Sequence, residues 1–183
     1  QLGLGACYAR GNGVPKNLAE AVKWYRKAAE QGEVAAQVIL GCQYGKGEGV
    51  ERDATEAVRW YRKAAEQGDA IAQFFLGRQY EEGEGVEKDQ VEAVKWFRKA
   101  ADQGYASAQL LLGIHYDMGE GVDKDAKEAV KWYRRAAEQG ELPAQFRLAY
   151  HYDSGTGVIK DPAEAYRWYL LSAAGGLEEA SGR

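Results

Sequence analysis

Residues 33–68 read EVAAQVILGCQYGKGEGVERDATEAVRWYRKAAEQG, and this stretch recurs along the chain with a period of 36 residues. Three kinds of residue keep that period without a slip. They are Trp24, Trp60, Trp96, Trp132 and Trp168; Tyr8, Tyr44, Tyr80, Tyr116 and Tyr152; and Gly32, Gly68, Gly104, Gly140 and Gly176. Such a period predicts an array of short units that bury a shared core by stacking.

The first half of each unit has the pattern of an amphipathic helix, which we call helix A. In the quoted unit Ala36, Leu40, Gly41 and Tyr44 fall on one helical stripe. A glycine inside a helix costs about 1 kcal/mol relative to alanine, so we expect another part of the chain to approach Gly41 closely. The Gly-x-Gly-Val segment that follows predicts a turn and not a phosphate loop, because it follows a helix and occurs in every unit.

The second half of each unit predicts another helix, called helix B. A side-chain acceptor is followed three residues later by Glu, which resembles a capping box. The five pairs are Asn17/Glu20, Asp53/Glu56, Asp89/Glu92, Asp125/Glu128 and Asp161/Glu164. Exposed Glu residues are expected to pair with Lys or Arg one turn away, as in Glu56–Arg59 and Arg62–Glu66. Gly68 is predicted to end helix B in the left-handed conformation.

Composition excludes several classes of function. The chain has 183 residues and a net charge of −4, with Lys and Arg interleaved among Glu, so no basic face for nucleic acid is indicated. No apolar run approaches the roughly 20 residues that cross a membrane. The two cysteines, Cys7 and Cys42, do not form a disulfide framework.

The pattern A-x-x-x-L-G-x-x-Y-x-x-G-x-G-V-x-x-D-x-x-x-A-x-x-W-Y-x-x-A-A-x-x-G resembles the Sel-one-like repeat, a branch of the tetratricopeptide superfamily. Residues 72–104 fit it closely, with Phe97 in place of Tyr. The resemblance implies an all-α fold, a right-handed α/α solenoid of helix–turn–helix repeats whose concave face is lined by the A helices. It also implies an adaptor that binds a protein or peptide partner. Many bacterial members of the family take part in host or envelope interactions.

We therefore predict a single α-solenoid domain over residues 1–183. Its repeats are expected at about 1–32, 33–68, 69–104, 105–140 and 141–176, with a further helix beginning in 177–183. The chain starts inside a repeat, so we expect an upstream segment to precede it. Both the bacterial cytoplasm and the periplasm or exterior are compatible with the sequence.

The partner is expected on the side of helix A opposite the packed stripe, where the units differ most. The predicted binding residues are Phe74, Arg78, Glu81, Glu82, Leu110, Ile114, Asp117, Met118, Phe146, Tyr150 and Asp153. Apolar anchors beside charges suit capture of a peptide or a helix. The alternative is that the row of Val38, Phe74, Leu110 and Phe146 only packs between neighbouring A helices.

No catalytic residue, metal site or cofactor is expected. His115 and His151 lie one repeat apart and border the packed stripe, which favours hydrogen-bonded flanking residues over metal ligands. A cysteine-rich branch of the family, linked to β-lactam binding or hydrolysis, carries paired cysteines where this chain has Ala29 and Gln37, Ala65 and Gln73, and Ala101 and Gln109. An enzyme of that kind, or an engineered consensus-like array, remains as an alternative to the scaffold.

The last helix B changes character, since residues 170–175 read LLSAAG where the earlier units have charged residues. We expect this surface to be covered by a further repeat, a cap or another subunit. Residues 177–180 are expected to begin a sixth helix A. Neither end is clearly capped, so self-association through the ends is also expected.

Overall fold

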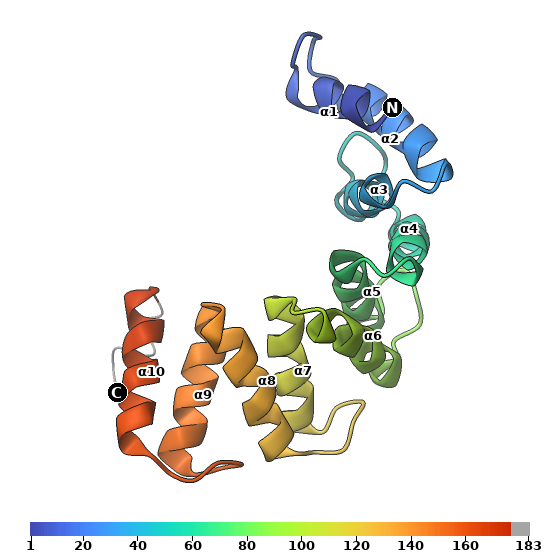
Figure 1. Cartoon of the computed structure of the whole chain (residues 1–183). Coiled ribbons are helices and arrows are strands. Elements are labelled where there is room, and N and C mark those ends of the chain that lie inside the picture. Colours follow the sequence, from blue (N-terminus) through green and yellow to red (C-terminus); the bar gives the residue numbers. More distant parts are fainter. Residues whose placement is uncertain (177–183) are drawn as a thin grey trace. The chain divides into compact units, whose positions relative to one another are not determined.

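The computed structural model describes residues 1–176, and within them the chain forms ten helices and no strand (Figure 1). The chain divides into two compact units, the first spanning Gln1–Asp89 and the second starting at Gln90. The helices of unit 1 are α1 (Leu2–Arg10), α2 (Leu18–Glu30), α3 (Val34–Lys46), α4 (Ala54–Glu66) and α5 (Ala70–Glu82). Those of unit 2 are α6 (Gln90–Asp102), α7 (Ala106–Met118), α8 (Ala126–Glu138), α9 (Leu142–Ser154) and α10 (Pro162–Ala174).

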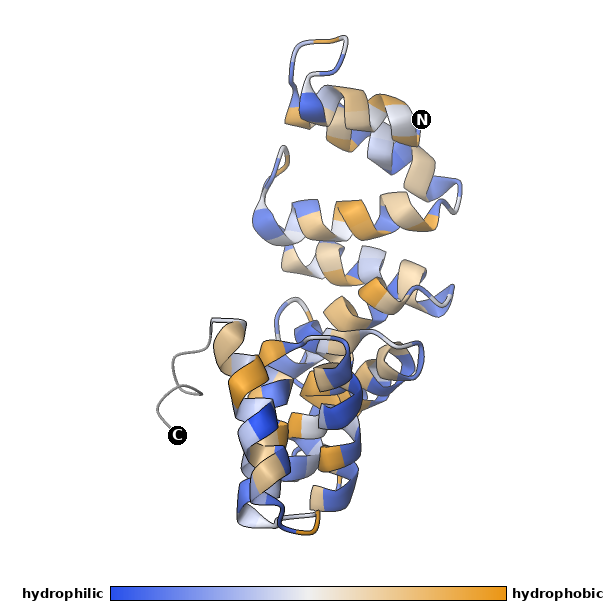
Figure 2. Cartoon of the chain, turned by 60° about the vertical axis from the view of Figure 1, so that its left-hand side comes forward, coloured by the Kyte–Doolittle hydropathy of each residue, from blue (hydrophilic) through white to orange (hydrophobic). Residues whose placement is uncertain are grey.

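The predicted helix–turn–helix repeats are confirmed, with the A helices odd-numbered and the B helices even-numbered. Each helix carries both hydrophobic and hydrophilic residues, as expected of helices that bury one side (Figure 2). No helix of residues 1–176 combines the length and apolarity that crossing a membrane requires. The hand of the array, the concavity of its A side and its continuity as one domain stay predictions.

Within a repeat, a tyrosine of helix B packs directly onto a glycine of helix A. A Cβ placed on Gly41 would lie less than 3.0 Å from three atoms of the Tyr61 ring. Gly113 meets Tyr133 in the same way, with a Cβ 2.6 Å from the ring. The close approach predicted for the helix-A glycine is therefore confirmed, and its partner is the aromatic residue of the following helix.

Successive repeats meet through the second glycine of each Gly-x-Gly-Val turn. These glycines have φ between 69° and 76° and lie against the first turn of the preceding B helix. The contacts are Gly49 with Leu18, Gly85 with Ala54, Gly121 with Gln90, and Gly157 with Ala126. A side chain at these positions would be strained by the backbone conformation and would also collide with the neighbouring helix.

Two further side-chain bonds repeat along the array and join a B helix to the next A helix. Gln37 donates from Nε2 to the Ala29 carbonyl at 3.1 Å, and Gln73, Gln109 and Gln145 do the same in later repeats. Arg62 donates to the Tyr80 hydroxyl at 2.7 Å. The predicted Arg62–Glu66 pair is therefore wrong, because the guanidinium reaches the hydroxyl of the next helix instead. Glu56–Arg59 is confirmed at 3.0 Å.

The B-helix caps follow half of the predicted capping box. The side chains of Asn17, Asp53, Asp125 and Asp161 accept from the backbone N–H three residues later, at 3.0–3.1 Å. The reciprocal Glu bond does not form, because the backbone N–H of the cap donates to the carbonyl of a helix-A tyrosine, as Asp53 does to Tyr44 at 2.9 Å. Gly68 ends helix B with φ of 96°, as predicted.

The apolar surface of α10 is present in the structure, with Tyr166, Leu170 and Leu171 exposed. Its coverage by a further element or subunit stays a prediction. The helix expected to begin at residues 177–180 lies outside the described residues.

Substitutions of two glycines in α3 distinguish the effect of close packing on stability from the effect of helix propensity. Gly41→Ala should lower the free energy of unfolding by about 1–3 kcal/mol, because the methyl group overlaps the Tyr61 ring. Gly45→Ala is the matched control: its Cβ would reach only Ala57, at 3.9 Å, so the better helix propensity of alanine should stabilise the chain by up to about 1 kcal/mol. Urea denaturation followed by circular dichroism measures both. Stabilisation by Gly41→Ala would contradict the packing.

Candidate partner-binding site

The predicted binding residues divide between the two units, and each set is described by itself. Unit 1 holds four of them on α5: Phe74, Arg78, Glu81 and Glu82. Unit 2 holds the other seven on α7 and α9: Leu110, Ile114, Asp117, Met118, Phe146, Tyr150 and Asp153.

On α5 the charged residues bind one another. The Arg78 guanidinium pairs with Glu82 and lies 3.4 Å from the Glu81 carboxylate. Phe74 packs edge-on against Phe75 at 5.4 Å, and Phe75 in turn stacks on Tyr61 at 5.2 Å. Arg78 was predicted as an anchor for a partner, but two carboxylates of its own helix already compensate its charge.

Two of the predicted apolar anchors of unit 2 belong to the packing. Leu110 is buried, with 9% of its surface exposed, so it offers little area to a partner. Phe146 is half-buried and meets the Tyr169 ring edge-on at 5.4 Å. For these two positions the structure favours the alternative interpretation, in which the apolar row packs between helices.

Asp117, predicted as a flanking charge, instead joins α7 to α8 and α9. Its Oδ2 accepts from the Tyr133 hydroxyl at 3.2 Å and lies 3.0 Å from Nε2 of the buried His151. The other ring nitrogen of His151, Nδ1, lies 2.8 Å from the Thr156 carbonyl oxygen. A carbonyl and a carboxylate only accept, so the ring satisfies both partners when both of its nitrogens carry protons.

Arg147 and Tyr133 complete this cluster. The Arg147 guanidinium lies 5.9 Å from the centre of the Tyr133 ring. Burial raises the pKa of the Tyr133 hydroxyl above its usual value, the Asp117 carboxylate raises it further, and Arg147 opposes both. Tyr133 therefore remains a neutral donor to Asp117. The signal in the sequence was Arg147 itself, which stands where the other A helices have Gly3, Ile39, Phe75 and Leu111.

The most exposed predicted residues of unit 2 are Met118 and Tyr150, at 58% and 48% exposure. Met118 directly follows Asp117, and Tyr150 directly precedes His151. The Asp117–His151 bond therefore brings their two segments together. Ile114 and Asp153 are half-buried on the same two helices. We call Ile114, Met118, Tyr150 and Asp153 the A face of unit 2.

Each of the two histidine rings lies against a backbone carbonyl oxygen. His115 is buried, with Nδ1 2.8 Å from the Glu120 carbonyl and its ring 5.5 Å from that of Phe97. Within residues 1–176 no group of three or more His, Cys, Asp or Glu side chains is placed to hold a metal ion. Both cysteines are free and half-buried.

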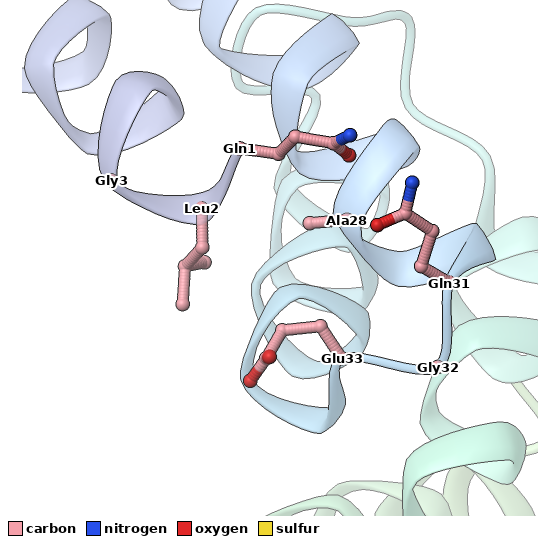
Figure 3. A pocket seen from close by; sticks show the side chains of 7 residues that line it. All are labelled: Gln1, Leu2, Gly3, Ala28, Gln31, Gly32 and Glu33. Atoms are coloured by element: carbon pink, nitrogen blue, oxygen red, sulfur yellow. The ribbon is translucent and has the colours of Figure 1, made fainter.

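A pocket of about 400 Å³ lies beside α1 and the turn after α2 (Figure 3). It is lined by Gln1, Leu2, Gly3, Ala28, Gln31, Gly32 and Glu33. None of the predicted binding residues contributes to it, and Ala28 is its only fully buried side chain. We therefore place the candidate site on the A face of unit 2 and not in this pocket.

These features define an α-helical repeat protein in which the A helices carry the variable surface. The family model of the Sel1 repeat matches residues 1–33, 34–69, 70–105, 106–141 and 142–177. The chain belongs to the Sel1 repeat family, within the tetratricopeptide-like superfamily, as its sequence pattern predicts. Proteins of this family typically mediate protein–protein interactions and are generally non-catalytic scaffolds.

Solved structures of the family agree closely with this fold. A protective antigen from uropathogenic Escherichia coli strains, described as displaying an SLR fold, is 46% identical with a TM-score of 0.95. The match covers 98% of this chain but 38% of that one. A Sel1 repeat protein from Oxalobacter formigenes is 44% identical with a TM-score of 0.89, and the match covers 98% of this chain and 71% of that one. No curated protein matches the chain.

The cysteine-rich branch is represented by cysteine rich protein B of Helicobacter pylori. It is 23% identical with a TM-score of 0.57, over 72% of this chain and 94% of that one, which shows a likeness of fold alone. Because the paired cysteine positions of that branch hold Ala and Gln here, the comparison gives no support to a β-lactam-directed enzyme.

A double-mutant cycle tests the link between α7 and α9. Asp117→Ala and His151→Ala should each lower the free energy of unfolding, and their coupling energy should be about 1–3 kcal/mol because the bond joins a carboxylate to a buried imidazole. The control is Glu138→Ala, an exposed change at the C-terminal end of α8. Its effect on the free energy of unfolding should add to that of Asp117→Ala. If the effects of Asp117→Ala and His151→Ala on the free energy of unfolding simply add in the same denaturation experiments, the bond between the two residues contributes nothing to stability.

Proposed function

We propose that the chain is a non-catalytic scaffold that binds a protein or peptide partner through the A face of unit 2. The observation that carries this proposal is the exposure of Met118 and Tyr150 on segments that the Asp117–His151 bond holds together. The family's general role in protein–protein interaction supports the proposal at a coarser level.

The repeat architecture requires neither Met118 nor Tyr150. The position of Met118 holds Lys46, Glu82 and Ser154 in other A helices, and that of Tyr150 holds Cys42, Arg78 and Ile114. Scattered exposed apolar residues are normal on protein surfaces, but these two lie on neighbouring segments. Tyr is enriched among binding hot spots, and the flexible Met side chain adapts to different partner surfaces.

The surroundings of the two residues suit capture of an amphipathic segment. Ile114 adds apolar surface on α7, one helical turn before Met118, and Asp153 adds a carboxylate on α9. Asp117 is committed to His151 and Tyr133, so it holds the face in place. An apolar anchor on the partner would contact Met118 and Tyr150, as helical peptides do when they bind in apolar grooves.

Peptides selected from a random display library on the immobilised chain test the proposal. Met118→Glu/Tyr150→Ala should weaken binding of a selected peptide at least about tenfold in calorimetry, since the loss of one hot spot costs 2 kcal/mol or more. The matched control is Ile71→Ala/Val91→Glu, which changes exposed apolar residues on α5 and α6. Equal affinities for the wild type and the Met118/Tyr150 variant would refute the assignment, as would equal losses in both double variants.

The enzymatic alternative has its own test. We expect no turnover of the β-lactam nitrocefin above the uncatalysed rate, because the cysteine pattern of the β-lactam-linked branch is missing. Colour development is followed at increasing concentrations of purified chain. Turnover that a single substitution abolishes would contradict the scaffold proposal.

A further inference from the structure

A second candidate surface lies on α8 and shares no residue with the A face. A groove of about 450 Å³ is lined by the charged residues Lys127, Lys131, Arg134, Arg135 and Glu138. Its apolar lining comes from the buried Val130, and Gly157 of the next turn borders it. A neighbouring hollow of about 340 Å³ shares Lys127 and Gly157 and extends to Val158 and Ile159. The two hollows adjoin at these two shared residues, and together we call them the α8 groove.

The charges of this groove are unbalanced. Four cations line it, and two carboxylates are available to them: Glu138 in the lining, and Glu128, which pairs with Lys131. Lys131 pairs with Glu128 at 3.1 Å, and the Arg135 guanidinium lies 4.6 Å from the centre of the Trp132 ring. The Lys127 ammonium makes no hydrogen bond or ion pair with any residue of 1–176. Such a cluster raises the local concentration of anions.

The same position on another helix shows that the repeat does not require this imbalance. The equivalent groove on α2 measures about 440 Å³ and carries Lys23, Arg26 and Lys27 against Glu20 and Glu30. The difference arises at Lys127, because the corresponding residues of the other B helices are uncharged. They are Ala19, Thr55, Val91 and Ala163.

One end of the groove is apolar. Ile159 is 88% exposed, and the corresponding residues of the other repeats are Pro15, Glu51, Glu87 and Asp123. Among residues 1–176 it is the most exposed of the large hydrophobic side chains. A ligand that fills the whole groove would therefore present carboxylates along α8 and an apolar group at Ile159.

We propose that the α8 groove binds an acidic polypeptide segment with an apolar residue at one end. Arg and Lys form charge-assisted hydrogen bonds with carboxylates, and Arg can do so in bidentate fashion. A helix of 13 residues is about 20 Å long, which corresponds to about six extended residues of a ligand. Nucleic acid fits less well, because the excess of cations is confined to one helix and the chain as a whole is negatively charged.

This surface is separate from the one in the proposed function. The A face consists of residues on α7 and α9, whereas the groove consists of α8 and the turn that precedes α10. Substitutions on one surface should leave binding at the other unchanged. The two proposals can therefore fail independently.

Fluorescence anisotropy with labelled six-residue peptides tests the proposal. Each probe carries one Leu and five alternating Asp and Glu residues. One probe has the Leu at its N-terminus, and the other has it at its C-terminus. The wild type should bind at least one probe saturably, and added salt should weaken binding. Lys127→Glu/Arg135→Glu should weaken it at least about tenfold. The matched control Lys23→Glu/Lys27→Glu alters net charge equally on α2 and should change the affinity less than about twofold.

Ile159→Ser gives a second readout that does not depend on charge. It should weaken the Leu-containing probe several-fold but leave a probe with Gly in place of Leu unaffected. Circular dichroism establishes that each variant is folded, and Met118→Glu/Tyr150→Ala should bind the acidic probe as the wild type does. The proposal is overturned by the absence of saturable binding, by equal losses in the α8 and α2 variants, or by equal affinity for a single-stranded oligonucleotide of the same charge.

Discussion

The packing of a helix-B tyrosine onto a helix-A glycine sets the spacing of the two helices in a repeat. Tyr61 and Tyr133 lie where a side chain on Gly41 or Gly113 would have to be. This contact brings the helix backbones close together and buries the ring. In α9 the corresponding residue is Ala149, which is buried with Ala165 and Tyr169, so the contact accepts a methyl group there. The turn glycines then place each repeat on the one before it, through contacts such as that of Gly49 with Leu18.

These contacts use few positions of each 36-residue unit, which leaves the remaining surface free to differ. The two functional proposals depend on residues that differ from their equivalents in the other repeats. The first depends on Met118 and Tyr150 on the A helices, and the second on Lys127 and Ile159 around α8. All four residues are exposed. Exposed apolar residues and uncompensated charges are more readily explained by binding than by stability.

The sequence predicted the elements well because helix periods, caps and turn glycines act over a few residues. The side-chain acceptors at Asn17 and Asp53 and the left-handed Gly68 are such local features. The Asp117–His151 bond was missed because it joins residues 34 positions apart, and its geometry depends on how α7 and α9 pack. For the same reason Arg62 could not be assigned to Tyr80 in advance. Leu110 and Phe146 share a periodic row with exposed residues, so periodicity alone could not separate packing from binding.

The most direct test of the binding face is to map a display-selected peptide onto the chain by NMR. At 20.2 kDa the isotope-labelled chain is suited to backbone amide spectra. Titration with the peptide should shift the amide signals of residues 114–118 and 146–153 most, because these segments carry the A face of unit 2. Shifts confined to the B helices would contradict the account.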